Sequence, residues 1–220
     1  MLKIAVFDSG YGGDFFIEWL KEEIPVVEIT PVIDWRNAES ILNSPKGARR
    51  VADAALSSII GKVDLVVFAN HLITATSLKH FRNKYKTQKF IGFELVKPDR
   101  FIKRNVLILT TKALSRTLCY QSFIFHLKTR TKTLCLDSWP ALIDDGELTE
   151  EEITKTIGDY LKHEKFHPEE IILACSQFQD IKGILSKYFG RNIRIYDSYE
   201  KTLRQICKTL RIRGGLKKQK

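Results

Sequence analysis

Reactive and polar side chains follow short apolar runs at four places in this 220-residue sequence. They are Asp8 and Ser9, Asn70 and His71, Thr110 and Thr111, and Cys175 and Ser176. A carboxylate can orient a polar substrate or hold a base in position, and hydroxyl and amide groups can bind a carboxylate. Histidine and cysteine can carry protons near neutral pH. These residue types are suited to binding a small acid and to moving a proton on it.

Cys175 is the strongest candidate for a nucleophile or proton carrier. It follows the apolar run 171–173, where we expect a strand to meet the amino terminus of a helix that stabilises its thiolate. Cys119, Cys135 and Cys207 are predicted within helices or a strand, where structural roles suit them better. No C-x-x-C pair occurs, so we expect neither a metal cage nor a disulfide framework, and free thiols fit the cytoplasm.

Each place also allows an interpretation without chemistry. The segment after Asp8 fits an ordinary strand-to-helix turn, and it lacks the Gly-Lys-Ser/Thr ending of a P-loop. His71 can be a solvent-facing loop residue, and the hydroxyls of Thr110 and Thr111 can cap the next helix. Composition alone favours buried structural cysteines.

Composition and charge exclude several classes of protein. Hydrophobic residues make up 44% of the chain, so a core can form and general disorder is excluded. No apolar run reaches the ~18 residues of a membrane span, and residues 4–7 are too short for a signal-peptide core. The net charge of +10 attracts nucleic acid in general. Without a nucleic-acid motif, however, we interpret it as a solvated basic surface and expect no nucleic-acid or membrane partner.

Short apolar runs alternate with longer amphipathic stretches along the whole chain. Strands are expected at residues 3–7, 26–33, 64–69, 89–93, 106–109, 132–136, 171–174 and 193–196. Helices are expected after residue 13, at 45–60, from about 76, at 113–127 and 150–163, through 185, and at 198–210. This alternation predicts an α/β protein with parallel sheets covered on both faces. Ligands bind such sheets at the carboxyl ends of the strands, where the four polar places stand.

A collinear series of motifs resembles the cofactor-independent aspartate/glutamate racemase superfamily, and glutamate racemase in particular. The opening D-S-G-x-G-G motif is matched in full by residues 8–13. Further matches are Pro45-Lys46-Gly47, residues 68–71, Thr110-Thr111 with 117–120, residues 139–146, residues 174–179 and residues 195–198. The resemblance covers nearly the whole chain.

The resemblance implies two Rossmann-like domains that face each other across a cleft, with the last helix returning to the first domain. The expected domains are residues 1–96 plus 198–220 and residues 97–197, with a seam near Lys97-Pro98. The resemblance also implies a small amino acid or dicarboxylate as ligand, with no cofactor and no metal. It is compatible with a homodimer.

Three departures from the family pattern bear on activity. Family racemases place one cysteine on each side of the substrate's α-carbon, but the first position here is Ala69. The family histidine after the second cysteine is Gln177, and the tyrosine of the substrate loop is Lys46. Loss of a general acid or base typically costs ~10²–10⁴ in rate, so conventional two-base racemisation is in doubt.

Three functions remain open, the weakest being a nucleic-acid binder suggested by the net charge of +10, and we favour the first, an altered enzyme. Its expected catalytic residues are Cys175, Asp8 and His71. Its expected substrate-binding residues are Ser9, Pro45, Lys46, Gly47, Asn70, Thr110, Thr111 and Ser176. The enzyme would be a cofactor-independent isomerase. Alternatively, it would resemble the decarboxylases of the family, which use one cysteine to protonate a carbanion-like intermediate. In either case Lys46 favours a dicarboxylate substrate. The alternative is a catalytically dead homologue that binds a small acid or a protein partner, as some glutamate racemases bind DNA gyrase.

Overall fold

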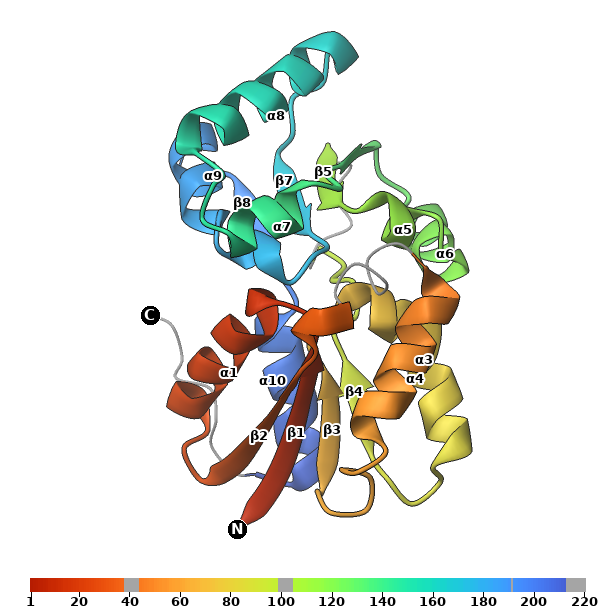
Figure 1. Ribbon diagram of the computed structural model, residues 1–220. Helices are drawn as coiled ribbons and strands as arrows, with labels where there is room; N and C mark the ends of the chain where they lie inside the picture. The colour runs from red at the N-terminus through yellow and green to blue at the C-terminus, as the bar shows by residue number, and fades with distance from the viewer. Residues whose placement is uncertain (38–43, 99–104, 191, 213–220) are drawn as a thin grey trace. The chain divides into compact units, whose positions relative to one another are not determined.

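The computed structural model describes residues 1–37, 44–98, 105–190 and 192–212 (Figure 1). The chain divides into two compact units. Unit 1 is Met1–Glu94 with Ser198–Lys220, and unit 2 is Leu95–Asp197. Unit 2 is therefore one continuous segment, whereas unit 1 combines two segments that are far apart in the sequence.

Unit 1 contains a four-stranded parallel sheet in the order β2-β1-β3-β4. Its strands are β1 (Leu2–Asp8), β2 (Val27–Ile33), β3 (Leu65–Phe68) and β4 (Phe90–Gly92). All residues of β3 are buried, as expected for a central parallel strand covered on both faces. Because the strands run parallel, the residues that follow Asp8 and Phe68 lie at the same edge of the sheet.

Helices cover both faces of this sheet (Figure 1). They are α1 (Tyr11–Glu23), α3 (Pro45–Leu56), α4 (His71–Lys84) and α10 (Tyr199–Leu210), and a 3₁₀ turn, η1, spans Trp35–Asn37. Ile4 and Val6 share a core with α1 and α10. Ala5 and Phe7 point the other way, into the core formed with α3 and α4. The alternation of side chains along β1 thus assigns one helix pair to each face.

Unit 2 repeats this plan with the parallel order β6-β5-β7-β8. Its strands are β5 (Val106–Thr110), β6 (Thr131–Cys135), β7 (Glu170–Leu173) and β8 (Arg194–Tyr196). Its helices are α5 (Lys112–Ser115), α6 (Leu118–Leu127), α7 (Trp139–Asp144), α8 (Glu150–Glu164) and α9 (Lys182–Phe189), and a 3₁₀ turn, η2, spans Gln177–Gln179. The predicted α/β class with parallel sheets is confirmed.

Several helices differ from the prediction, and α3 ends at Leu56 rather than at residue 60. Helix α4 begins at His71 rather than near residue 76, because Asn70 caps it. The helix predicted at 113–127 is two helices, α5 and α6, separated at Thr117. The Thr117 hydroxyl accepts from the Tyr120 N–H at 3.1 Å and donates to the Leu114 carbonyl at 2.8 Å, which ends one helix and starts the next. The short helix α7 was not predicted.

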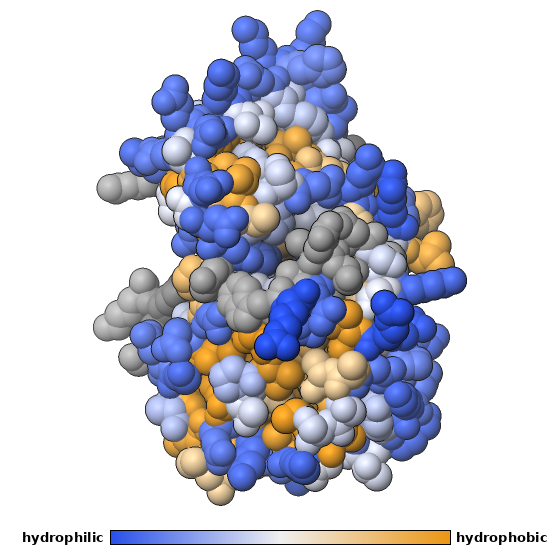
Figure 2. Space-filling view, in the orientation of Figure 1, coloured by the Kyte–Doolittle hydropathy of each residue, from blue (hydrophilic) through white to orange (hydrophobic). Residues whose placement is uncertain are grey.

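The surface carries both charged and apolar side chains (Figure 2). Apolar side chains gather over α6, where Leu118 is 88% and Phe125 is 79% exposed. Within the described part of the chain, no helix is long and apolar enough to cross a membrane.

Candidate functional site

Asp8 lies at the carboxyl end of β1 and is fully buried. Its Oδ1 accepts hydrogen bonds from the Ser9 N–H at 2.7 Å and from Asn70 Nδ2 at 2.9 Å. A Cβ on Gly13 would lie 2.5 Å from Asp8 Cβ and 2.9 Å from Ile33 Cδ1. Glycine at position 13 therefore allows the first turn of α1 to pack against the Asp8 side chain. Ser9 is buried beside it.

Asn70 joins the ends of two neighbouring strands. Its Nδ2 donates to Asp8, and its Oδ1 accepts from the Ile73 N–H at 3.0 Å as the cap of α4. The amide thus orients the carboxylate of one strand while fixing the helix that follows the next. The substrate-binding role of Asn70 stays a prediction, and these contacts give its side chain a positioning role.

His71 is buried in the first turn of α4, so the interpretation as a solvent-facing loop residue is wrong. Its Nε2 lies 2.9 Å from Ser198 Oγ, and the Ser198 hydroxyl donates to the Glu94 carbonyl at 2.9 Å. Ser198 Oγ therefore accepts from Nε2–H, which leaves the lone pair on Nδ1. Among the described residues this buried Nδ1 has no hydrogen-bond partner.

The protonation state of His71 follows from this environment. Burial, and after it the charge of Lys201, lower the pKa of His71 from 6.5 to about 3. A neutral imidazole with so low a pKa is a weak base near pH 7. The catalytic role predicted for His71 stays a prediction, and its contacts with Ser198 are those of a structural residue.

Ala69, at the position of the missing first cysteine, has 0% exposure and packs in the core beneath α1 and α10. Its methyl group cannot carry a proton.

The predicted substrate loop forms the start of α3. Ser44 caps this helix by accepting from the Gly47 N–H at 3.2 Å, Pro45 is its first residue, and Lys46 is exposed in its first turn. Pro suits this position because the missing N–H would be unpaired there. Lys46 is exposed to solvent, and its role in binding an anionic ligand stays a prediction.

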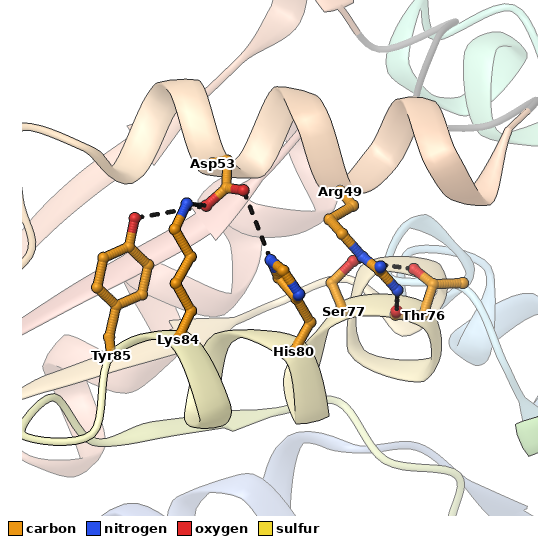
Figure 3. Close-up of polar contacts among 7 residues, drawn as sticks. All are labelled: Arg49, Asp53, Thr76, Ser77, His80, Lys84 and Tyr85. Carbon is orange, nitrogen blue, oxygen red and sulfur yellow. Dashed lines mark hydrogen bonds and ion pairs between the residues drawn. The ribbon is translucent and has the colours of Figure 1, made fainter.

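Polar contacts hold α3 against α4 (Figure 3). Arg49 Nη2 donates to the Thr76 carbonyl at 2.7 Å. Asp53 lies 2.8 Å from Lys84 Nζ and 3.7 Å from His80 Nε2. These contacts tie the helix that begins at the substrate loop to the helix that begins at His71.

In unit 2, Thr110 is the last residue of β5 and Thr111 follows it, and both are buried. Thr111 Oγ1 accepts from the Leu114 N–H at 3.4 Å and caps α5. Thr110 Oγ1 lies 3.5 Å from the Thr111 carbonyl. The capping interpretation thus holds for Thr111, while carboxylate binding by the pair stays a prediction.

Cys175 is partly buried just after β7 and belongs to a connected polar group. Its thiol donates to Gln177 Oε1 at 3.1 Å, and the Ser176 hydroxyl donates to the same oxygen at 3.0 Å. Gln177 Nε2 in turn donates to Asp144 Oδ2, at the end of α7, at 3.4 Å. Sequence reasoning missed the supporting roles of Gln177 and Asp144. The sequence identifies Gln177 only as the residue at the position of the family histidine, and Asp144 lies within the matched segment 139–146 without a role assigned to it.

The predicted helix directly after Cys175 is wrong. The 3₁₀ turn η2 follows it, and α9 begins only at Lys182. A helix dipole is effective only within the first turn, so α9 does not stabilise a thiolate at Cys175. The local hydrogen bonds, rather than a dipole, define the environment of this sulfur.

The other cysteines fit the structural interpretation unevenly. Cys119 and Cys135 are exposed, so buried structural roles do not describe them. Cys207 is partly buried in α10, and burial raises the pKa of its thiol.

Two further features of the structure bear on ligands. Across the described ranges, no group of three or more His, Cys, Asp or Glu side chains could hold a metal ion. A cavity of about 630 Å³ in unit 2 is lined by residues of α8 and α9 and of the segment between α8 and β7. None of the predicted site residues lines it.

Comparison with known proteins gives a consistent set of relatives, although no protein-family model matches the chain. Glutamate racemase of Aquifex aeolicus is 21% identical over 212 aligned positions, covering 93% of this chain and 82% of the relative. Glutamate racemase of Clostridium novyi is 26% identical over 226 aligned positions, covering 95% and 83%.

Solved structures agree with this. Escherichia coli glutamate racemase, in complex with L-glutamate and the activator UDP-MurNAc-Ala, has a TM-score of 0.85 at 17% identity. The similarity covers 98% of this chain and 84% of that one. Picrophilus torridus aspartate racemase has a TM-score of 0.62 at 16% identity, covering 95% and 94%.

Proposed function

Because the chain is a homologue of the glutamate racemases and has the fold of the aspartate/glutamate racemase superfamily, we propose a racemase-type function for it. The ligand is a small amino acid or dicarboxylate. The chemistry is cofactor-independent proton transfer at a carbon alpha to a carboxylate, with Cys175 as the proton carrier. The cleft between the two domains, in which the sequence resemblance places this ligand, stays a prediction.

The environment of Cys175 is the observation that carries this proposal. The thiol stands at the carboxyl end of a central strand, the edge where α/β sheets bind ligands, and it is only partly buried. A defined set of hydrogen bonds orients it through Gln177. Cys175 also matches the second cysteine of the racemase motif, which is independent support from the sequence.

The proton carrier on the opposite face of the substrate must be a group other than the first family cysteine, because Ala69 stands at that position. Asp8 and His71 are the proposed candidates for this role, and His71 is a weak base near pH 7 because burial lowers its pKa to about 3. Asp8 is held in place by Ser9 and Asn70. The exposed Lys46 and the buried hydroxyl of Ser9 are the proposed carboxylate-binding groups of unit 1.

The test is exchange of the substrate's α-proton in deuterated water, followed by NMR over a panel of L- and D-glutamate, aspartate and related dicarboxylates. Cys175→Ser should lower the exchange rate by ~10²–10⁴. Cys119→Ser, which changes an exposed cysteine elsewhere in unit 2, is the matched control and should exchange at the wild-type rate. Full activity in Cys175→Ser would rule out the proposed role.

A binding protein without catalysis is the second candidate. The loss of the first cysteine favours it, because the methyl group of the buried Ala69 cannot carry a proton at that position. This candidate predicts dicarboxylate binding by calorimetry without any deuterium exchange. Measurable exchange that depends on Cys175 would reject it.

A further inference from the structure

We propose that Gln177, oriented by Asp144, is a positioning residue that keeps Cys175 protonated, so that this thiol acts as a proton donor and not as a base. The inference deepens the proposed function, and the role of Cys175 as a proton donor rests on that function. Its structural part concerns only the ionisation of one thiol and can be tested without a substrate.

The hydrogen bond from the Cys175 thiol to Gln177 favours the neutral thiol. The acceptor of the Cys175 S–H is the side-chain carbonyl oxygen of Gln177, 3.1 Å away. Such an oxygen accepts hydrogen bonds and cannot donate one, so this contact stabilises S–H and would be lost on ionisation. The Ser176 hydroxyl also donates to this oxygen, at 3.0 Å, and therefore does not donate to the sulfur.

The orientation of the Gln177 amide follows from Asp144. The glutamine is 3% exposed, and its Nε2 lies 3.4 Å from Asp144 Oδ2. Reversing the amide would direct its oxygen at a carboxylate inside a buried site, where two acceptors facing each other are costly. Asp144 thus selects the orientation that presents the carbonyl oxygen to Cys175. A carboxylate behind the amide also disfavours a second negative charge on the sulfur.

As a consequence, Cys175 transfers its proton in one direction, from the thiol to the substrate. The S–H bond of Cys175 breaks, its proton joins the electron pair of a carbanion alpha to a carboxylate, and the resulting thiolate recovers a proton from water. The carbanion must be formed by another group, either a base on the opposite face or the departure of carbon dioxide. Gln177 cannot titrate, so it offers Cys175 no help as a base, unlike the histidine that the racemase motif has at this position.

The experiment measures alkylation of individual thiols by iodoacetamide across pH, in the full-length protein, with peptide mass spectrometry to follow each cysteine. Because thiolate is the reactive form, the pH midpoint of alkylation reports ionisation. We expect the midpoint for Cys175 to lie above that of the exposed Cys119 in the same sample. Gln177→His should move the Cys175 midpoint to lower pH and raise its rate at pH 7 by about tenfold or more, since an imidazolium donates to a thiolate.

Gln121→His, an exposed glutamine of α6 in the same unit, is the matched control and should leave the Cys175 curve unchanged. A wild-type Cys175 midpoint at or below that of Cys119 would overturn the inference. So would an unchanged curve in Gln177→His. Either result leaves the deuterium-exchange test of the proposed function intact, so the two can fail separately.

Discussion

Single residues decide the local geometry around Asp8. Gly13 stands so close to this carboxylate that any side chain carbon would collide with Asp8 Cβ and Ile33. Because Asp8 Cβ is attached directly to the backbone of a central strand, it cannot swing away as the end of a long side chain would. The glycine of the racemase-like motif is therefore a packing requirement at this position.

We expect Gly13→Ala to lower the free energy of unfolding by about 1–3 kcal/mol, the usual cost of overpacking. Gly183→Ala is the control, because nothing lies within 4 Å of a Cβ built at this helical position. It should be neutral or gain up to about 1 kcal/mol from helix propensity. Urea denaturation of both variants measures the difference, and equal stabilities would contradict the packing argument.

At the scale of elements, the start of α4 connects three candidate residues of unit 1, Asp8, Asn70 and His71. Asn70 caps this helix and binds Asp8, while His71 in its first turn meets Ser198 at the start of α10. Ser198 is also bonded to the Glu94 carbonyl, the last residue before the chain leaves unit 1. The start of α4 thus contacts the end of β1 and the start of α10.

Asn70→Ala should destabilise the protein by more than the ~1 kcal/mol typical of a lost cap, because Asp8 also loses a buried donor. Thr149→Ala is the matched comparison, since Thr149 caps α8 in an exposed capping box without contacting the site. The difference between the two losses, measured by chemical denaturation, isolates the Asp8 contact. Equal losses would mean that this contact adds nothing.

The buried, neutral His71 predicts a pH dependence of stability. Its pKa in the folded state is about 3, against an ordinary value of 6.5, so below pH 6.5 the unfolded chain binds a proton that the folded chain does not. The contribution of neutral His71 to the free energy of unfolding is complete above pH 6.5. It is lost as the pH falls toward 3, by up to about 1.4 kcal/mol per pH unit.

His71→Gln is the variant that tests this, because its amide N–H can replace Nε2–H at Ser198 without titrating. Unfolding free energies of wild type and variant between pH 7 and 4 should diverge as the pH falls. Parallel curves would show that His71 ionises equally in both states.

For the molecule as a whole, the chain path makes the two units unequal. Unit 2 is continuous, whereas the core of unit 1 contains Tyr199, Leu203 and Ile206 of α10 together with residues of β1 and β3. Removing α10 would expose this face of the first sheet, and a large buried apolar side chain contributes ~1.5–3 kcal/mol.

We therefore expect a fragment of residues 95–197 to fold alone, and a fragment of residues 1–94 to fold only when a peptide of residues 198–220 is added. Dispersed amide resonances in two-dimensional NMR spectra report folding in each case. A folded 1–94 fragment without the peptide would contradict the structural role of α10.

The sequence by itself determined the strands, because continuous apolar runs bounded by turns leave few alternatives in a parallel sheet. Parallel strands end at one edge, so the order of polar residues after those runs also indicated where each candidate residue would lie. The sequence determined the helix boundaries less well. A single capping hydrogen bond, such as that made by Asn70 or Thr117, decides where a helix begins, and the periodicity of apolar residues does not reveal it.

Only the tertiary structure decided what the candidate residues can do. His71 looked like a base until burial beside Ser198 and Lys201 set its pKa at about 3. Cys175 looked like a thiolate at a helix terminus until Gln177 and the distant Asp144 made it a hydrogen-bond donor. Burial and hydrogen-bond partners come from residues far apart in the chain, and they set protonation, which residue type and spacing alone do not.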